Sequence, residues 1–147
     1  MRFSANISML FTEAPFLERF EGAAEAGFSA VEFWWPLGAS LDLVEAAARS
    51  AGVDVVLFNF LAGDMAAGDR GLLADPDRQH EFRENVPVAL DLAQRLGCSR
   101  LNALVGLERP GLDPKVQLDL AVHNLRWAAD QAVGAGISVL VEAVNRA

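Results

Sequence analysis

The sequence has few of the residues from which disulfides and zinc sites are built. Among its 147 residues it has one cysteine, Cys98, and two histidines, His80 and His123. A disulfide within the chain is therefore excluded, and a reducing, cytoplasmic setting is expected. Because no His-x-x-x-His or Cys-x-x-Cys spacing occurs, no zinc centre is predicted. Cys98 is expected to be a small buried residue of the core.

Positive charge and long apolar runs are also scarce. Lysine and arginine together number 12 against 20 aspartates and glutamates, which gives a formal charge of −8. An acidic chain offers no broad electrostatic surface to nucleic acid or to anionic membranes, so neither is expected as a partner. No apolar run approaches the roughly 18 residues of a membrane span. Residues 1–6 contain no apolar signal region either.

Strand-like and helix-like segments alternate along the chain. The expected strands cover residues 3–7, 30–34, 53–60, 100–105 and 137–142. The expected helices begin near Thr12, Ser40, Asp77 and Asp113 and end near Gly27, Gly52, Gly97 and Gly134. This alternation predicts a parallel sheet of βαβ units in one domain, residues 1–147. The last helix is expected to turn an apolar stripe inward, namely Leu118, Val122, Leu125 and Ala129.

Two architectures fit about five strands and four helices. One is a complete, doubly wound five-stranded sheet, which the length favours because a whole eight-stranded barrel needs about 250 residues. The other is the N-terminal portion of a (β/α)8 barrel. The lack of a helix after the fifth strand favours the barrel. Strand order separates the two, since a barrel has the order 1-2-3-4-5 and a receiver-like sheet has 2-1-3-4-5.

Polar residues stand at or just beyond the carboxyl ends of the expected strands. The carboxyl ends of parallel strands are where α/β proteins place their ligands. A single asparagine there can simply support a turn, but the set as a whole predicts a site for a small polar molecule. Glu32 is equally consistent with substrate contact and with structural pairing. The set comprises Asn6, Glu32, Asn59, Asn102, Glu142 and Asn145.

Glu142 follows the apolar residues 139–141, so dry surroundings are expected for its carboxylate. A carboxylate in such surroundings needs a cation, a metal or a proton. Glu142 is therefore a candidate for proton transfer and for a ligand of a hard divalent cation such as Mg²⁺ or Mn²⁺. The chain stops at Ala147, soon after this residue, which suggests a fragment.

A long segment, residues 61–75, separates the third strand from the third helix and contains Gly63, Gly68 and Gly71. Segments of this length in compact domains are often functional lids. Arg70 could bind a substrate carboxylate through two parallel hydrogen bonds. The alternative is a surface arginine paired with Asp64 or Asp69.

Together these residues resemble the hydroxypyruvate isomerase family, within the xylose isomerase-like TIM barrels. The similarity runs through residues 3–11, Val31-Glu32-Phe33, the segment 59–71 and residues 102–106. Glu142 and Asn145 match the family's Glu-Pro-x-Asn motif, with Ala143 in place of the proline. The resemblance covers the whole chain, and the segment 59–71 is its most specific part.

The resemblance implies an intramolecular oxidoreductase that interconverts the aldehyde and ketone forms of a small hydroxy-oxo acid. The implied substrates are hydroxypyruvate and tartronate semialdehyde, or a 2-oxo-tetronate. Glu142 would be a proton donor and acceptor and a metal ligand, and a second glutamate would come from a later strand. The 147-residue piece alone is then expected to be inactive. Its open sheet edges could pair with another copy, so a homo-oligomer is expected.

Three alternatives stay open. The first is a sugar epimerase on the same barrel, and the second is an apurinic endonuclease, against which the acidic charge weighs. The third is a non-enzymatic, doubly wound signalling or binding module. We expect Asn6, Asn59, Arg70, Asn102 and Asn145 to contact the substrate if the isomerase interpretation holds.

Overall fold

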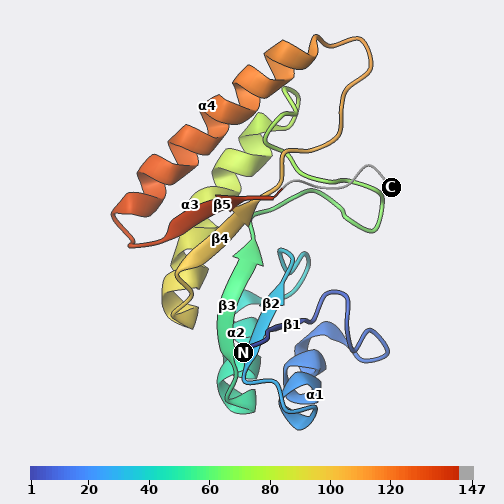
Figure 1. Cartoon of the computed structure of the whole chain (residues 1–147), viewed down its shortest axis with the longest axis vertical. Helices are drawn as coiled ribbons and strands as arrows, with labels where there is room; N and C mark the ends of the chain where they lie inside the picture. The colour runs from blue at the N-terminus through green and yellow to red at the C-terminus, as the bar shows by residue number, and fades with distance from the viewer. Residues whose placement is uncertain (143–147) are drawn as a thin grey trace.

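The computed structural model describes residues 1–142 and contains one parallel sheet. Its five strands follow one another in the order β1-β2-β3-β4-β5, as in a barrel, and not in the receiver-like order. Figure 1 shows the chain leaving β3, β4 and β5 at the same end of the sheet. The strands are β1 (Ala5–Asn6), β2 (Ala30–Phe33), β3 (Asp54–Asn59), β4 (Arg100–Ala103) and β5 (Ser138–Val141).

The helices lie between successive strands, and α3 and α4 pack side by side next to β4 and β5 (Figure 1). The elements are the 3-10 turn η1 (Phe16–Glu18) and the helices α1 (Arg19–Glu25), α2 (Leu41–Ala51), α3 (Gln79–Leu96) and α4 (Pro114–Val133). Among residues 1–142, no helix combines the length and the apolar character that crossing a bilayer requires.

Several helix ends lie where the sequence predicts them. Gly52 and Gly97 follow α2 and α3 with φ angles of 66°, the left-handed conformation that glycine adopts without steric cost. The carboxylate of Asp113 accepts a hydrogen bond from the backbone N–H of Lys115 at 2.8 Å and so caps α4.

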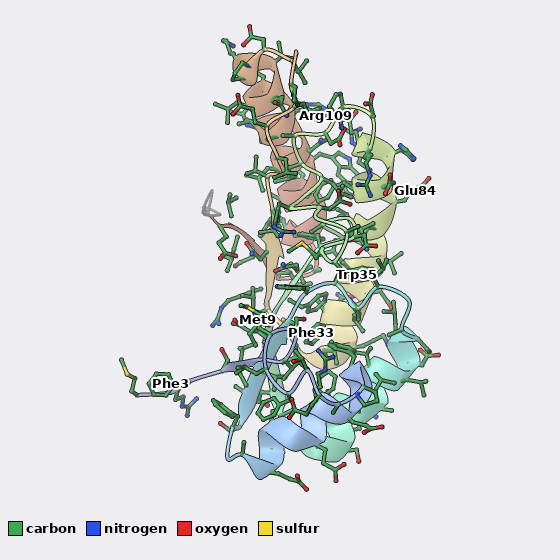
Figure 2. The ribbon with its side chains drawn as sticks, turned by 90° about the vertical axis from the view of Figure 1, so that its right-hand side faces the viewer. Phe3, Met9, Phe33, Trp35, Glu84 and Arg109 are labelled. Carbon is green, nitrogen blue, oxygen red and sulfur yellow. The ribbon has the colours of Figure 1, made fainter. Side chains whose placement is uncertain are left out.

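The first helix and the first strand are shorter than predicted. Thr12 is not a helix cap, because Pro15 is extended (ψ 147°) and the chain enters α1 only after the 3-10 turn. The expected strand 3–7 pairs only through Ala5 and Asn6. Phe3 projects away from the body of the molecule (Figure 2) and is exposed.

The core lies between the sheet and the helices and is rich in phenylalanine. The rings of Phe33 and Phe58 stack with centroids 5.3 Å apart, and Phe20 meets Phe33 edge-on. Cys98 is buried as predicted, and its Sγ lies 3.2 Å from the carbonyl oxygen of Arg100. Burial raises the pKa of this thiol.

The apolar stripe predicted for α4 is wrong in part, because Leu118 and Val122 are 59% and 37% exposed. Amide side chains face inward instead. Gln117 donates to the carbonyl oxygens of Ala74 and Leu107, and Asn124 donates to that of Leu73 at 2.9 Å. These carbonyls belong to irregular segments that have no ladder partners, so buried amides satisfy them.

Candidate functional site

A cavity of about 250 Å³ lies at the carboxyl ends of the strands. It gathers polar side chains from the first four strands, from the position just after β5 and from the segment between β3 and α3. They are Asn6, Glu32, Asn59, Arg70, Asn102 and Glu142. Met9, Met65, Leu104 and Trp34 are among the apolar residues of its wall. Asn145 lies outside the described residues, so its predicted contact stays a prediction.

Two amides connect β3, β4 and β5 across the floor of this cavity. Asn59 and Asn102 are register partners in the β3–β4 ladder and are only 6% and 4% exposed. The Nδ2 of Asn102 donates to Oε2 of Glu142 at 2.9 Å and lies 3.3 Å from Oδ1 of Asn59. A nearly buried amide therefore orients the glutamate carboxylate.

Glu142 itself is exposed, which corrects the expectation of dry surroundings. The apolar run before it would be buried if β5 had a strand on each side. Among residues 1–142, β5 pairs only with β4 and is the edge of the sheet. Leu140 and Val141 are exposed for the same reason.

Glu32 has the structural pairing that was one of its two possible roles, and its contact with a substrate stays a prediction. Its two carboxylate oxygens accept from Oγ of Ser4 at 3.2 Å and from Nδ2 of Asn6 at 3.3 Å. It also lines the cavity. Next to it, the backbone N–H of Trp34 donates to Oγ of Ser8 at 2.9 Å. Trp34 also lines the cavity.

Arg70 is not paired with Asp64 or Asp69, so the surface ion pair considered for it is wrong. The Asp69 carboxylate is bound instead by Nη1 of Arg78 at 2.7 Å. Nη1 of Arg70 donates to the backbone oxygens of Met65 at 3.1 Å and of Asp69 at 2.7 Å.

The other edge of the Arg70 guanidinium makes no described hydrogen bond. Within residues 1–142, its Nε and Nη2 have no hydrogen-bond partner. These two nitrogens form one side of the planar group, and a carboxylate can accept from both at once. Arg70 lines the cavity, and its predicted contact with a substrate carboxylate stays a prediction.

The described residues do not by themselves form a site for Mg²⁺ or Mn²⁺. Within residues 1–142, no three His, Cys, Asp or Glu side chains are placed to share an ion. Glu142 is one carboxylate, and the Asn102 group next to it is an N–H donor. Hard divalent cations take about six oxygen ligands, so the predicted metal would need further ligands from elsewhere and stays a prediction.

Comparison with known proteins agrees with this arrangement. Residues 20–147 match the model of the family described as xylose isomerase-like TIM barrel. The chain belongs to the xylose isomerase-like TIM barrel family. With the strand order, this membership confirms the predicted fold, the N-terminal portion of a (β/α)8 barrel, and rules out the doubly wound alternative.

Curated relatives of this TIM barrel chain are named as isomerases. A putative hydroxypyruvate isomerase of Streptomyces coelicolor is 46% identical over 99% of this chain and 55% of its own length. The hydroxypyruvate isomerase of Escherichia coli is 41% identical over 99% and 56%. A 2-oxo-tetronate isomerase of Pectobacterium atrosepticum is 40% identical over 98% and 55%. The chain spans about half the length of these relatives.

Solved structures show the same barrel. A protein of Brucella melitensis named as an AP endonuclease, family 2, superposes with a TM-score of 0.88 at 46% identity, over 98% of this chain and 55% of its own. A D-psicose 3-epimerase superposes with a TM-score of 0.71 over 99% of this chain and 53% of its own. Its identity is 17%, so this second likeness concerns the fold alone.

Sequence reasoning missed some residues around the cavity. Met9, Met65 and Leu104 form part of its wall; they lie in segments that carry the family resemblance, but no polar side chain marked them as candidates. The ion pair between Asp69 and Arg78 spans nine positions of irregular chain, and no periodicity signals it. The sequence offered one weak indication, the acidic and basic residues gathered between Asp64 and Arg78.

Proposed function

We propose that the native full-length protein is an isomerase that interconverts the aldehyde and ketone forms of a small hydroxy-oxo acid. Hydroxypyruvate with tartronate semialdehyde, or a 2-oxo-tetronate, are the substrates to test first. The proposal rests on one observation: the same cavity is lined by Glu142 and by Arg70, whose Nε and Nη2 make no hydrogen bond within residues 1–142. The names of the curated relatives support it.

In this proposal Arg70 holds the substrate carboxylate, and Glu142 moves the proton. For hydroxypyruvate, Glu142 takes a proton from carbon 3, beside the carbonyl, and an enediolate forms. Glu142 returns a proton to carbon 2, while the hydroxyl proton moves from the oxygen on carbon 3 to that on carbon 2. One C–H bond breaks and another forms, so the product is the isomeric aldehyde acid. Proton transfer by a positioned carboxylate typically contributes roughly 10²–10⁴-fold in rate.

The described geometry supports these roles in two ways. Asn102 donates to Oε2 of Glu142, so the carboxylate has a fixed orientation while its other oxygen can accept a proton. The cavity of about 250 Å³ is smaller than the roughly 300–1,000 Å³ typical of sites for drug-sized ligands. A three- or four-carbon acid suits a space of this size.

Arg70→Ala in the native full-length protein tests the binding role. Loss of two charge-assisted hydrogen bonds is expected to raise KM for hydroxypyruvate by roughly 10- to 100-fold. Arg49→Ala is the control, because Arg49 is exposed on α2 and, among residues 1–142, pairs with Glu45 alone. An unchanged KM in Arg70→Ala would remove this role from the proposal.

Cleavage of DNA at abasic sites is the second candidate, because the 46% identical Brucella melitensis structure is named as an AP endonuclease, family 2. The formal charge of −8 opposes binding to a polyanion. Incubation of the native full-length protein with a duplex that contains one abasic site decides between the two. We expect no metal-dependent strand cleavage, and efficient cleavage without isomerase turnover would replace our proposal with this one.

A further inference from the structure

The turn that carries Arg70 is closed by aspartate side chains. The backbone N–H of Asp64 donates to Oδ2 of Asp69 at 2.7 Å, and that of Asp69 donates to the Asp64 carbonyl at 3.0 Å. Oδ1 of Asp64 accepts from the N–H groups of Ala66 and Ala67. Gly63 has a φ of 83°, and a Cβ at this position would overlap the Asp69 side chain. The turn therefore has little freedom as long as Asp69 stays in place.

Arg78 connects this turn to helix α3. Its Nη1 donates to Oδ2 of Asp69 at 2.7 Å. Its Nε and Nη2 donate to both oxygens of Glu81, in the first turn of α3, at 2.8 and 2.9 Å. A two-point contact with a helical residue fixes the guanidinium plane and leaves one nitrogen aimed at Asp69.

Arg70 depends on the same turn through its backbone. The two oxygens that hold its Nη1 are the carbonyls of Met65 and Asp69, both of which belong to the turn. On the other side of Arg70, the N–H of Gly71 donates to the carbonyl of Ala62 at 3.0 Å, and Gly71 forms a bridge with Val105 beside β4. One neighbour of Arg70, Gly71, is thus fixed by the chain just after β4, and the other, Asp69, is fixed by Arg78.

We propose that Arg78 is a positioning residue: through Asp69 it holds the turn that aims the Nε–Nη2 edge of Arg70 into the cavity. This inference rests on the proposed function, in which Arg70 binds the substrate carboxylate. Arg78 does not line the cavity. Its effect on the reaction therefore passes through Asp69 and the backbone to Arg70.

The test uses Arg78→Gln in the native full-length protein, with hydroxypyruvate as the substrate. A small displacement of a binding group can cost up to about 100-fold, and for this indirect effect we expect KM to rise by about 5- to 20-fold with kcat within about twofold. Hydroxyacetone, which lacks the carboxylate, serves as a competitive inhibitor, and its inhibition constant is expected to stay unchanged. Arg49→Gln is the matched control.

Two further variants separate positioning from general destabilisation. Asp69→Asn keeps an acceptor for the Asp64 N–H but weakens the contact with Arg78, so it should raise KM in the same way. The double variant Arg70→Ala/Arg78→Gln should bind no worse than Arg70→Ala alone, because Arg78 acts through Arg70.

The outcomes distinguish this inference from the proposed function. If Arg70→Ala leaves KM unchanged, the carboxylate-binding role fails, and the positioning role fails with it. If Arg70→Ala raises KM but Arg78→Gln does not, or if the double variant shows the product of both effects, the positioning role alone is overturned. A rise in the inhibition constant of hydroxyacetone equal to the rise in KM would also overturn it, because the whole cavity would then have changed.

Discussion

The two sides of the cavity are held in different ways. On the side of the segment between β3 and α3, Arg70 is held by backbone carbonyls, and its turn is held by Asp69, Arg78 and a close approach to β4. On the side of β5, Glu142 is exposed and has one described contact, from Asn102. Arg70, the proposed binding group, is thus fixed by contacts within the described chain, whereas Glu142, the proposed proton-transfer group, is oriented by a single described amide. Substitutions on the two sides should therefore affect different kinetic constants.

The largest expected effect is on the β5 side. In the native full-length protein, Glu142→Gln keeps the shape and an acceptor for Asn102 but cannot take a proton. We expect kcat to fall about 10³-fold with KM within a few-fold, as determined by steady-state kinetics. Retention of most of the kcat would show that another residue transfers the proton.

Gly71→Ala tests how firmly the Arg70 side is held. Gly71 has a φ of 129°, and a Cβ there would run into the backbone carbonyl of Leu104. We expect the free energy of unfolding to fall by roughly 3 kcal/mol. Gly68→Ala is the matched control, because its φ is 106° but nothing lies within 4 Å of the added carbon. It should cost only about 1 kcal/mol. Equal losses of unfolding free energy, measured by chemical denaturation, would contradict the close contact of Gly71 with the chain just after β4.

Asn102→Ala tests the single contact that orients Glu142. Loss of this nearly buried amide leaves Oδ1 of Asn59 without its partner and Glu142 without its described donor. We expect the free energy of unfolding to fall by about 1–2 kcal/mol and kcat to fall roughly tenfold. An unchanged kcat would mean that Glu142 is positioned by something other than Asn102.

The smallest expected effect is the pH dependence of the stability that Asp69 contributes. The hydrogen bond from Arg78 holds the pKa of Asp69 below its ordinary value of 3.8, aided by the Asp64 N–H and the charge of Arg70 and opposed by partial burial. A lowered pKa in the folded protein stabilises it above the ordinary value, and this stability is lost as the pH falls through the folded-state pKa. The difference in melting temperature between wild type and Asp69→Asn should therefore be present at about pH 7 and shrink at about pH 3. Asp119→Asn, which removes an exposed pair with Lys115, is the control. A difference in melting temperature that grows toward low pH would contradict the lowered pKa of Asp69.

The sequence was sufficient for the order of strands and helices, because that order depends on local signals. Glycines that end helices, the Asp113 cap and the polar residues at strand ends are each visible in a few neighbouring positions. The family resemblance added the barrel, which strand counting alone left open against a doubly wound sheet.

Burial and side-chain pairing could not be predicted from the sequence where they depend on residues far apart in the chain. Leu118 and Val122 have the spacing of a buried stripe, yet Gln117 and Asn124 are buried because distant carbonyls need donors. The run before Glu142 is apolar, but burial also requires a second neighbouring strand. Arg70 lies next to Asp69 in the sequence, but Arg78 binds that carboxylate and leaves one edge of Arg70 open.

Hydrogen exchange during turnover tests the central claim most directly. The native full-length protein is incubated with hydroxypyruvate in D₂O, and deuterium at carbon 3 of the substrate and carbon 2 of the product is followed by NMR. Transfer through Glu142 predicts deuterium at these carbons with the wild-type protein and almost none with Glu142→Gln. Isomerisation that proceeds without any solvent deuterium in substrate or product, or labelling that persists in Glu142→Gln, would contradict the account.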